Sequence, residues 1–542
     1  MSLTDTHVAR DYAEAVFRRG REPLPPANFE PNWADQPSRH KVYREVTRVP
    51  LPRADGVRLG PPRTAAATPG TAWDLGGLAA LLRLSYGVLD RRLRVDWNHD
   101  AHNRMHFPQT AWGRGTASGG GMYPLEVYLV TAGRDGLLPG VYHYSTAHHA
   151  LDRLATGNAV DRVGAALLDH PAAADTDDYL LVSVRFWKNS FKYNSFCYHV
   201  VTQDLGALLG SWELIAAGLD WSWQRLLWFD DRAMDDVLGL DTDEESVLAV
   251  VPLPRGGAGP AHSGPVRAAG SALTAPRSPA AVAPRTPRRP CFERSTTLLR
   301  FELVDRVHGA SLVRTEPRPA PPRLADPEPA RNPVELPEPV GDDRTGADLT
   351  ELLRRRHSAF GSFAGAALSL ADTATVLAAA AGATRYASDV TDPASPLTGL
   401  HLVANRVDAL PAGAYHYRPG AHRLEPVVRQ PVAAFLQRCY FLQNYNLAEV
   451  GAVLAISAPL DPLLAHYGNR ALRLVNSEVG SVAQTVYLTT TALGIGCGAV
   501  LGVDNIAMNE LLGLDGTDRR TFLFLLLGST PDRSADVTLS LT

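Results

Sequence analysis

The chain repeats itself, and this repeat limits its possible folds more than any other feature. LPGVYHY at 138–144 returns as LPAGAYHY at 410–417, and a leucine follows seven residues later in both copies. Lys192-Tyr193 returns as His466-Tyr467, and VLGLD at 237–241 returns as LLGLD at 511–515. The copies lie 273 to 274 residues apart. We therefore expect two similar domains, packed as a pseudo-dimer about an approximate twofold axis.

The 542 residues exceed what one hydrophobic core organises, which agrees with two domains. Pro-rich stretches at 254–290 and 317–339 have compositions that cannot bury a core. We predict a first domain over 1–255, a Pro/Ala-rich linker or arm over 256–334, and a second domain over 335–542. Between the two Pro-rich stretches, TTLLRFELVDRV at 296–307 alternates in polarity and predicts a strand.

Each half has the pattern of an α+β domain, a sheet covered by helices. Two segments of about twenty residues are apolar at helical spacing on several sides, which predicts buried core helices. Shorter apolar runs predict strands. The predicted helices cover 200–219 and 474–495, and the predicted strands include 124–132, 247–253, 399–405 and 521–528.

Composition excludes several classes of function. The net charge of −4 gives no basic field for nucleic acid. Without a bilayer-length apolar run or a signal-peptide apolar region, we expect no membrane partner and a cytoplasmic location. Four cysteines without a CxxC pair argue against a disulfide framework. We predict no metal, since His99, His102 and His106 lie in a polar stretch typical of a loop.

Two motifs have the chemistry to hold an anionic, planar ligand. RGTASGGGMYP at 114–124 has three glycines after a serine, which let backbone amides approach a ligand closely. LLRRRHSAF at 352–360 offers arginines and a serine that suit a phosphate. The alternatives are a tight surface turn for the first motif and a solvated basic face for the second.

Lysine is rare in this chain, with three residues against fifty arginines. Lys188 and Lys192 both fall in FWKNSFKY at 186–193, among aromatic residues. A lysine beside Tyr193 could act as a general base or acid, because burial and neighbouring charges bring such pKa values toward neutrality. The alternative is an amphipathic segment with solvated lysines. Cys497 in GIGCG has no evident partner base, so we expect it to pack among small residues.

Together these motifs resemble the nitroreductase-like flavoproteins, and more closely the SagB-type azoline dehydrogenases. The resemblance implies one FMN between the two halves, bound by an Arg-x-Ser motif, a Gly-rich loop and a backbone segment that faces the flavin ring. It implies Lys192 and Tyr193 as the catalytic pair. The implied cofactor-binding residues are Ser118, Gly119, Gly120, Gly121, Arg355, Arg356, His357, Ser358, Leu501 and Gly502.

Each half departs from the family where the other half keeps the motif. The Arg-x-Ser of the first half, Arg83-Leu84-Ser85, lacks the neighbouring arginines found at 354–356. The second half has SDVTDP at 388–393 in place of the Gly-rich loop and His466 in place of the lysine. Two acidic residues there would repel a flavin phosphate, so we predict one composite site. Ala117 replaces the usual proline, and Phe360 stands where a basic residue is common, so phosphate binding is expected to depend on the arginines.

The resemblance implies an FMN-dependent dehydrogenase that oxidises thiazolines or oxazolines to thiazoles or oxazoles in a ribosomally made, modified peptide. Lys192 or Tyr193 would remove a ring proton while hydride passes to the flavin, which oxygen reoxidises. The expected partners are an azoline-containing precursor peptide and a cyclodehydratase or leader-binding protein. Two alternatives remain: an NAD(P)H-dependent nitroreductase acting on small molecules, and a flavin-free scaffold that recruits a peptide.

Overall fold

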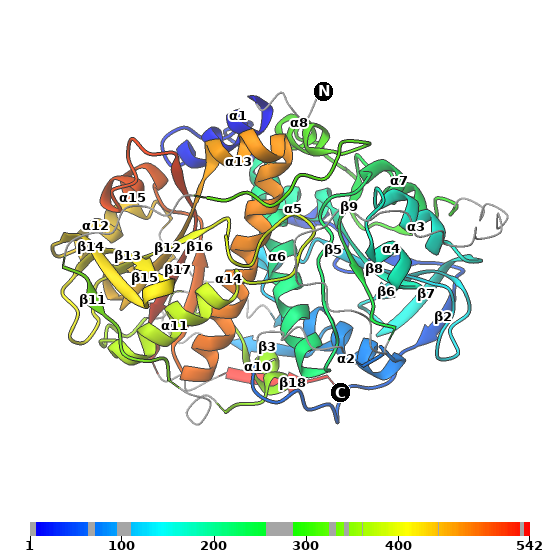
Figure 1. The fold of residues 1–542 in the computed structure, drawn as a ribbon, viewed down its shortest axis with the longest axis horizontal. Coiled ribbons are helices and arrows are strands. Elements are labelled where there is room, and N and C mark those ends of the chain that lie inside the picture. The colour runs from blue at the N-terminus through cyan, green and yellow to red at the C-terminus, as the bar shows by residue number, and fades with distance from the viewer. Residues whose placement is uncertain are drawn as a thin grey trace, which may run out of the picture.

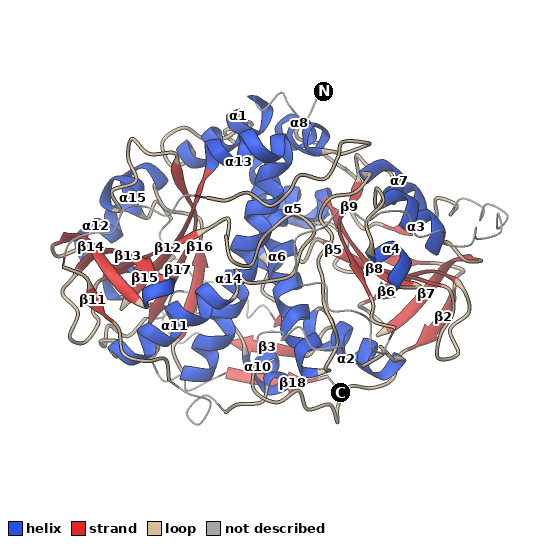
Figure 2. Ribbon diagram, viewed as in Figure 1, coloured by secondary structure: helices blue, strands red, loops and turns tan. Residues whose placement is uncertain are grey.

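The computed structural model describes residues 7–62, 71–94, 110–255, 286–324, 332–340, 346–359, 361, 363–442, 444–531 and 536–541. Two α+β units lie side by side, and long helices run between their sheets (Figure 1). The predicted α+β pattern, made twice, is confirmed. Figure 2 shows the two large sheets at the two flanks, with helices between them.

The first unit is built on a six-stranded sheet in the order β2-β7-β6-β5-β8-β9, with antiparallel neighbours. Its strands are β2 (Thr47–Pro50), β5 (Leu125–Thr131), β6 (Gly140–Ser145), β7 (Ala150–Thr156), β8 (Asp178–Arg185) and β9 (Glu245–Pro252). Its helices are α2 (Leu75–Ser85), α3 (Val160–Ala166), α4 (Ala172–Asp175), α5 (Phe186–Tyr193), α6 (Cys197–Gly218) and α7 (Asp231–Leu238).

The second unit repeats this order in a seven-stranded sheet, β11-β14-β13-β12-β15-β17-β16, where β16 is an added edge strand. Its strands are β11 (Val334–Glu335), β12 (Gly399–Ala404), β13 (Gly413–Arg418), β14 (Arg423–Arg429), β15 (Ala452–Pro459), β16 (Gly496–Val500) and β17 (Arg519–Gly528). Its helices are α10 (Leu349–Arg355), α11 (Leu370–Gly382), α12 (Ala433–Cys439), α13 (Leu460–Tyr467), α14 (Ala471–Leu493) and α15 (Asn505–Leu511).

Helices α6 and α14 cross closely where each has a glycine. A Cβ added to Gly206 would lie 2.6 Å from the carbonyl carbon of Ser477, and one added to Gly480 would lie 2.8 Å from that of Gln203. Gln203 and Ser477 are separated by 274 residues, as are the two glycines. Each contact is therefore the repeat of the other, which is the relation that a twofold axis imposes.

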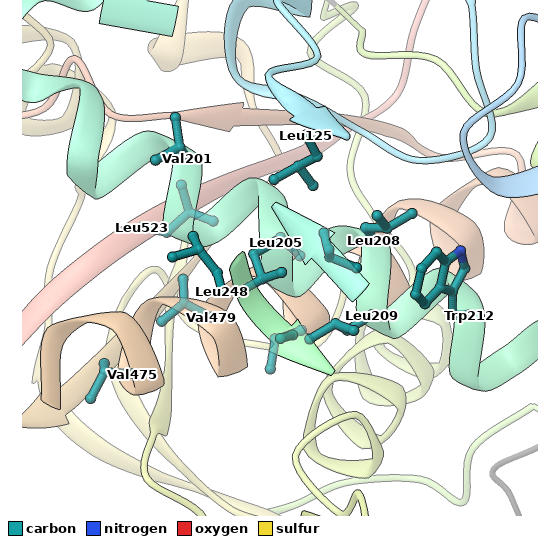
Figure 3. Packing of buried hydrophobic residues seen from close by; sticks show 14 of the residues in the cluster. Leu125, Val201, Leu205, Leu208, Leu209, Trp212, Leu248, Val475, Val479 and Leu523 are labelled. Carbon is teal, nitrogen blue, oxygen red and sulfur yellow. The ribbon is translucent and has the colours of Figure 1, made fainter. Parts of the chain in front are cut away.

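The hydrophobic core includes the side chains around the crossing of α6 and α14. Leu205, Leu208 and Leu209 of α6 pack with Val475 and Val479 of α14 in one cluster of buried side chains (Figure 3). Both helices are buried on nearly all sides. The prediction of two buried core helices is confirmed.

The repeated YHY motif has a structural role in both units. Tyr142 donates its hydroxyl hydrogen to the carbonyl of Leu138 at 2.6 Å, and Tyr415 does the same to Pro411 at 2.6 Å. Each bond spans four residues and closes the turn before the hairpin. The last tyrosine of the motif lies 3.0 Å from the His149 ring in the first unit.

Both ends of the chain cross to the opposite unit. Helix α1 (His7–Arg18) contacts the second unit, where the Ala9 amide donates to Asn469 Oδ1 at 2.9 Å. Strand β18 (Asp536–Ser540) pairs with β3 (Asp90–Arg94), which also pairs with β4 (Thr110–Gly113). The two units are therefore joined at the edges as well as at α6 and α14.

The predicted strand at 296–307 is wrong, because this segment leads into helix α8 (Glu302–Ser311). Val304, Val307, His308 and Ser311 are buried, at the i, i+3, i+4 and i+7 spacing of one helical face. Leu298 and Leu299 are exposed, so the alternation that suggested a strand does not match burial. Before α8, β10 (Cys291–Phe292) pairs with β1 (Val42–Tyr43).

Among the described residues, no helix combines the length and the apolar character needed to cross a bilayer. His99, His102 and His106 lie outside the described residues.

Candidate active site

The Gly-rich loop is held to α6 by one carboxylate. Ser118 Oγ donates to Asp204 Oδ2 at 2.6 Å, and the Gly119 amide donates to Asp204 Oδ1 at 2.7 Å. Ser118 Oγ also accepts from the Tyr123 amide at 2.9 Å. The Ser118 side chain therefore shapes the loop itself. Gly120 and Gly121 have φ of 60° and 68°, a left-handed conformation that favours glycine.

The same loop is held to α14 by a glutamine of the second unit. The Ala117 amide donates to Gln484 Oε1 at 2.9 Å, and Gln484 Nε2 donates to the Gly115 carbonyl at 3.1 Å. Gln484 is fully buried. The loop is thus fixed by both central helices, one from each unit.

Lys192 and Tyr193 end helix α5 directly against this loop. Lys192 Nζ donates to the Gly120 carbonyl at 3.3 Å. A Cβ on Gly120 would lie 2.6 Å from that ammonium nitrogen, so the lysine approaches closely because residue 120 has no side chain. Burial lowers the pKa of Lys192. Burial, and then the charge of Asp204, raise the pKa of Tyr193, while Arg19 opposes the rise.

The other two lysines are buried in ion pairs. Lys41 Nζ lies 2.6 Å from Glu245 Oε2, and Lys188 Nζ lies 3.4 Å from Glu126 Oε1. Burial alone would lower both pKa values. Glu245 reverses this for Lys41, whose pKa is raised, whereas the pKa of Lys188 falls to about 8. Lys192 is the lysine that faces the Gly-rich loop.

Of the predicted phosphate motif, Arg356 and Ser358 contact the core of the site. Arg356 Nε donates to the Gly115 carbonyl at 2.9 Å, and its guanidinium lies 5.4 Å from the centre of the Tyr487 ring. Ser358 Oγ lies 3.0 Å from Tyr487 Oη, which also accepts from the Ala499 amide at 2.8 Å. Arg356 thereby joins the second unit to the start of the Gly-rich segment, just after β4.

Arg355 and His357 lie on the surface beside these residues. Arg355 forms an exposed ion pair with Glu351 at 3.1 Å, one helical turn earlier. His357 is exposed, and its Nδ1 lies 3.1 Å from the Arg355 carbonyl. Phe360 lies outside the described residues.

Leu501 and Gly502 follow β16 at the edge of the second sheet. In the described part of the chain, neither backbone amide has a hydrogen-bond acceptor. At the repeat offset of 274, their counterparts are Leu227 and Trp228. Those two amides donate to Asp389 Oδ1 at 2.8 Å and Oδ2 at 3.1 Å. The amides of Leu227 and Trp228 therefore have a protein carboxylate as acceptor, whereas those of Leu501 and Gly502 have no acceptor in the described part of the chain.

Asp389 belongs to the SDVTDP segment that replaces the second Gly-rich loop. It is buried, and Arg318 Nε donates to its Oδ2 at 3.2 Å. Beside it, the fully buried Arg225 stacks on Tyr386 at 3.9 Å and forms an ion pair with Glu213. Side chains thus occupy the place that corresponds to the first site, and a cavity of about 300 Å³ between α6, α11 and α14 remains next to them.

The first site has the groups that FMN requires. The amides of residues 501 and 502, which have no acceptor in the described part of the chain, suit the polar edge of a flavin ring, and a Cβ added to Gly121 would meet no atom within 4 Å. Arg356 contributes a positive charge, and its Nε and Nη2 already donate to the Gly115 and Arg114 carbonyls. Ser358 contributes a hydroxyl that also contacts Tyr487 Oη. The residues present therefore fit the cofactor.

Sequence reasoning missed Gln484 and Asp204 as residues that organise this region. It singled out Asp389 as one of two acidic residues in the 388–393 segment, but not its hydrogen bonds to the Leu227 and Trp228 amides. A signal existed for Asp204, since Glu478 lies 274 residues later in the second apolar helix. Gln484 is likewise a polar residue in an apolar helix. Acidic or amide side chains in such helices are buried and must find partners.

Comparison with known proteins places part of the chain in a family. Residues 353–529 match the nitroreductase family. A nitroreductase-like protein of Methanocaldococcus jannaschii is 29% identical over 167 residues, which are 30% of this chain and 83% of that protein. The trifolitoxin-processing protein TfxB of Rhizobium leguminosarum bv. trifolii is 29% identical over 140 residues, 24% of this chain and 37% of TfxB.

A crystal structure of a nitroreductase-like protein from Anabaena variabilis matches with a TM-score of 0.73 at 23% identity. The match covers 97% of this chain and 99% of that one, so the similarity in fold extends over both units. Residues 353–529 thus form a nitroreductase-family domain, and the whole chain has the nitroreductase-like fold. The predicted fold class is confirmed.

Proposed function

We propose that this protein is an FMN-dependent dehydrogenase that oxidises thiazolines or oxazolines to thiazoles or oxazoles in a ribosomally made peptide. The observation that carries this proposal is the half-buried Lys192, held against the Gly120 carbonyl at 3.3 Å beside Tyr193. Members of the nitroreductase family are FMN-dependent oxidoreductases, and such a lysine adds a base to that site.

The cofactor site uses both units. Ser118, Gly119, Gly120 and Gly121 would border the ring from the first unit, and the amides of Leu501 and Gly502 would donate to it from the second. Arg356 and Ser358, with Arg355 and His357 at the surface, would bind the phosphate. Bound FMN would accept a hydride from the azoline ring. One FMN per chain is expected, because Asp389 occupies the donors of the second position. The Arg225, Tyr386 and Glu213 side chains lie beside it and also fill that position.

Lys192 and Tyr193 have different roles in the proposed reaction, one as the base and the other as a hydrogen-bond donor. Burial lowers the pKa of Lys192, which increases the share of neutral amine near pH 7 and favours it as the base. The raised pKa of Tyr193 keeps its phenol neutral, so that it acts as a hydrogen-bond donor. Oxidation removes one proton and one hydride from adjacent ring atoms: Lys192 takes the proton, and the pair of electrons leaves with the hydride.

A peptide substrate is supported by the similarity to TfxB, whose name states that it processes trifolitoxin. An azoline in a peptide must first be formed by cyclodehydration. We therefore propose an azoline-containing precursor peptide as the substrate, and a cyclodehydratase or leader-binding protein as the partner.

The first test is the visible absorption spectrum of the purified protein, with the released cofactor counted per chain. One FMN per chain is the expected result. Two per chain would contradict the single composite site. A colourless protein that binds no added FMN, yet still binds precursor peptide, would favour a peptide-recruiting scaffold instead.

The second test compares three variants on azoline peptides. Lys192→Ala should lower kcat about 100-fold or more, since a general base contributes roughly 10²–10⁴-fold. Tyr193→Phe should lower it less. His466→Ala is the matched control, because His466 is the repeat counterpart of Lys192 and contacts the Ala320 carbonyl at 2.7 Å. Equal activity of Lys192→Ala and His466→Ala would refute the catalytic assignment.

A general nitroreductase is the second candidate, favoured by the match to the Methanocaldococcus jannaschii protein. It predicts rapid NAD(P)H oxidation with a nitroarene or a quinone. It also predicts that Lys192→Ala leaves this rate unchanged, because hydride transfer between a nicotinamide and a flavin needs no base at that position.

A further inference from the structure

Asp204 fixes the two residues that precede Gly120. Its two carboxylate oxygens accept separate hydrogen bonds, from Ser118 Oγ at 2.6 Å and from the Gly119 amide at 2.7 Å. Asp204 is 5% exposed, so water does not compete for these bonds. The direction of the next peptide group therefore depends on this carboxylate.

That next peptide group is the one that contacts the lysine. The Gly120 carbonyl accepts from Lys192 Nζ at 3.3 Å, and the φ of 60° and ψ of 14° at Gly120 together set where this carbonyl points. A continuous chain of contacts thus runs from Asp204 through Ser118 and Gly119 to Lys192. The other titratable or charged groups that face this chain among the described residues are Tyr193, Arg19, Tyr86 and Cys197.

The second unit has a buried acid at the same repeat position, without the lysine. Glu478, the repeat counterpart of Asp204, accepts from the Thr398 amide at 2.9 Å and from Thr398 Oγ1 at 2.7 Å. The position that corresponds to Lys192 is His466, which contacts the Ala320 carbonyl. The buried acid therefore stabilises a loop in both units, but it is linked to a lysine in one.

We propose that Asp204 is a positioning residue for Lys192, acting through the Gly-rich loop; this rests on the proposed catalytic role of that lysine. In an Asp204→Asn variant, Oδ1 can still accept from the Gly119 amide, but the NH₂ group can only donate to Ser118 Oγ, so the Ser118 hydroxyl hydrogen loses its acceptor. The charge-assisted Ser118 hydrogen bond is lost, the loop loosens, and Lys192 gains contact with water.

The proposal is tested by measuring the pKa of Lys192 itself, in an experiment that does not depend on catalytic turnover. FMN-saturated protein is pulsed with acetic anhydride across a pH series, and acetylation of residue 192 is measured by mass spectrometry. The chain suits this method because its other lysines, Lys41 and Lys188, are buried in ion pairs. The midpoint for wild-type protein should lie below the ordinary value of 10.5, because burial lowers the pKa of Lys192.

Asp204→Asn should move this midpoint up toward 10.5, and Ser118→Ala, which removes one of the two bonds, should move it less. Glu478→Gln is the matched control: it weakens the equivalent anchor in the other unit and should leave the midpoint unchanged. With azoline peptides, Asp204→Asn should lower kcat more than it changes KM.

An unchanged midpoint in both Asp204→Asn and Ser118→Ala would overturn the proposal. If Asp204→Asn does not fold, Ser118→Ala alone decides. Protein that binds no FMN would refute the proposed function but not this inference, because acetylation can be measured on colourless protein.

Discussion

Replacing Gly206 with alanine should force apart the crossing of α6 and α14. The added Cβ would lie 2.6 Å from the carbonyl carbon of Ser477 and 2.9 Å from its Cα. Nonbonded carbons prefer roughly 3.5 Å or more, so the helices must separate by about 1 Å. The obstructing atoms belong to the α14 backbone, which cannot rotate away as a side chain can.

Overpacking of a core typically lowers the free energy of unfolding by about 1–3 kcal/mol. Because the obstacle to Gly206→Ala is backbone, we expect a loss of about 3 kcal/mol, at the upper end of this range. Alanine recovers about 1 kcal/mol through its higher helix propensity. The net loss of about 2 kcal/mol corresponds to a fall in Tm of roughly 4–8 °C.

The assay is thermal unfolding of three variants. Gly480→Ala should match Gly206→Ala, because its Cβ would lie 2.8 Å from the carbonyl carbon of Gln203 across the pseudo-twofold axis. Gly309→Ala is the control, since this exposed glycine of α8 has no atom within 4 Å of the added Cβ, and it should gain up to about 1 kcal/mol. Unchanged Tm values for Gly206→Ala and Gly480→Ala would refute the close crossing.

Three further predictions concern buried acids. Asp389→Ala leaves the Leu227 and Trp228 amides unpaired and should lower the free energy of unfolding, measured by denaturant titration, by about 3 kcal/mol. Its FMN content should stay at one per chain. A second FMN would mean that this carboxylate alone closes the second position. Asp231→Asn, measured the same way, should cost about 3–5 kcal/mol, because Asp231 pairs with the buried Arg470 and Arg473 at 2.6 and 2.9 Å. Burial raises the pKa of Asp204 from 3.8 to about 7, so its protonated form stabilises the fold and this stability is lost as pH rises. Between pH 4 and 7, wild-type protein should therefore lose about 1.4 kcal/mol per pH unit relative to Asp204→Asn, and parallel stability curves would contradict the shift.

The repeat made the fold predictable because it reports on packing as well as on local structure. The YHY motif recurs since Tyr142 and Tyr415 close equivalent turns, and the apolar helices recur since they pack against each other. The strand prediction for 296–307 was wrong because Leu298 and Leu299, which contributed to the alternation of polar and apolar residues, are exposed. Which face of α8 is buried depends on the elements that pack against it, and the segment's own sequence does not identify them.

The candidate site was predictable in its motifs but not in its contacts. Lys192 and the Gly-rich loop were identified from residue types, yet the sequence gives no indication that the carbonyl of Gly120 is the acceptor. Gln484 lies 369 residues from Gly115 along the chain, and Asp389 lies 162 from Leu227. Contacts over such separations depend on the docking of whole units, which local patterns do not encode.

Asp389 explains why two similar halves can hold one cofactor without leaving unpaired backbone amides at the second position. Two backbone donors in a buried place lose free energy unless something accepts from them. A ligand can do so, but only while it is bound. In the first unit Leu227 and Trp228 have a permanent acceptor in Asp389, which Arg318 in turn neutralises, so this half is satisfied without a ligand. The amides of Leu501 and Gly502 have no such acceptor in the described part of the chain, so the stability of the second unit should respond to FMN.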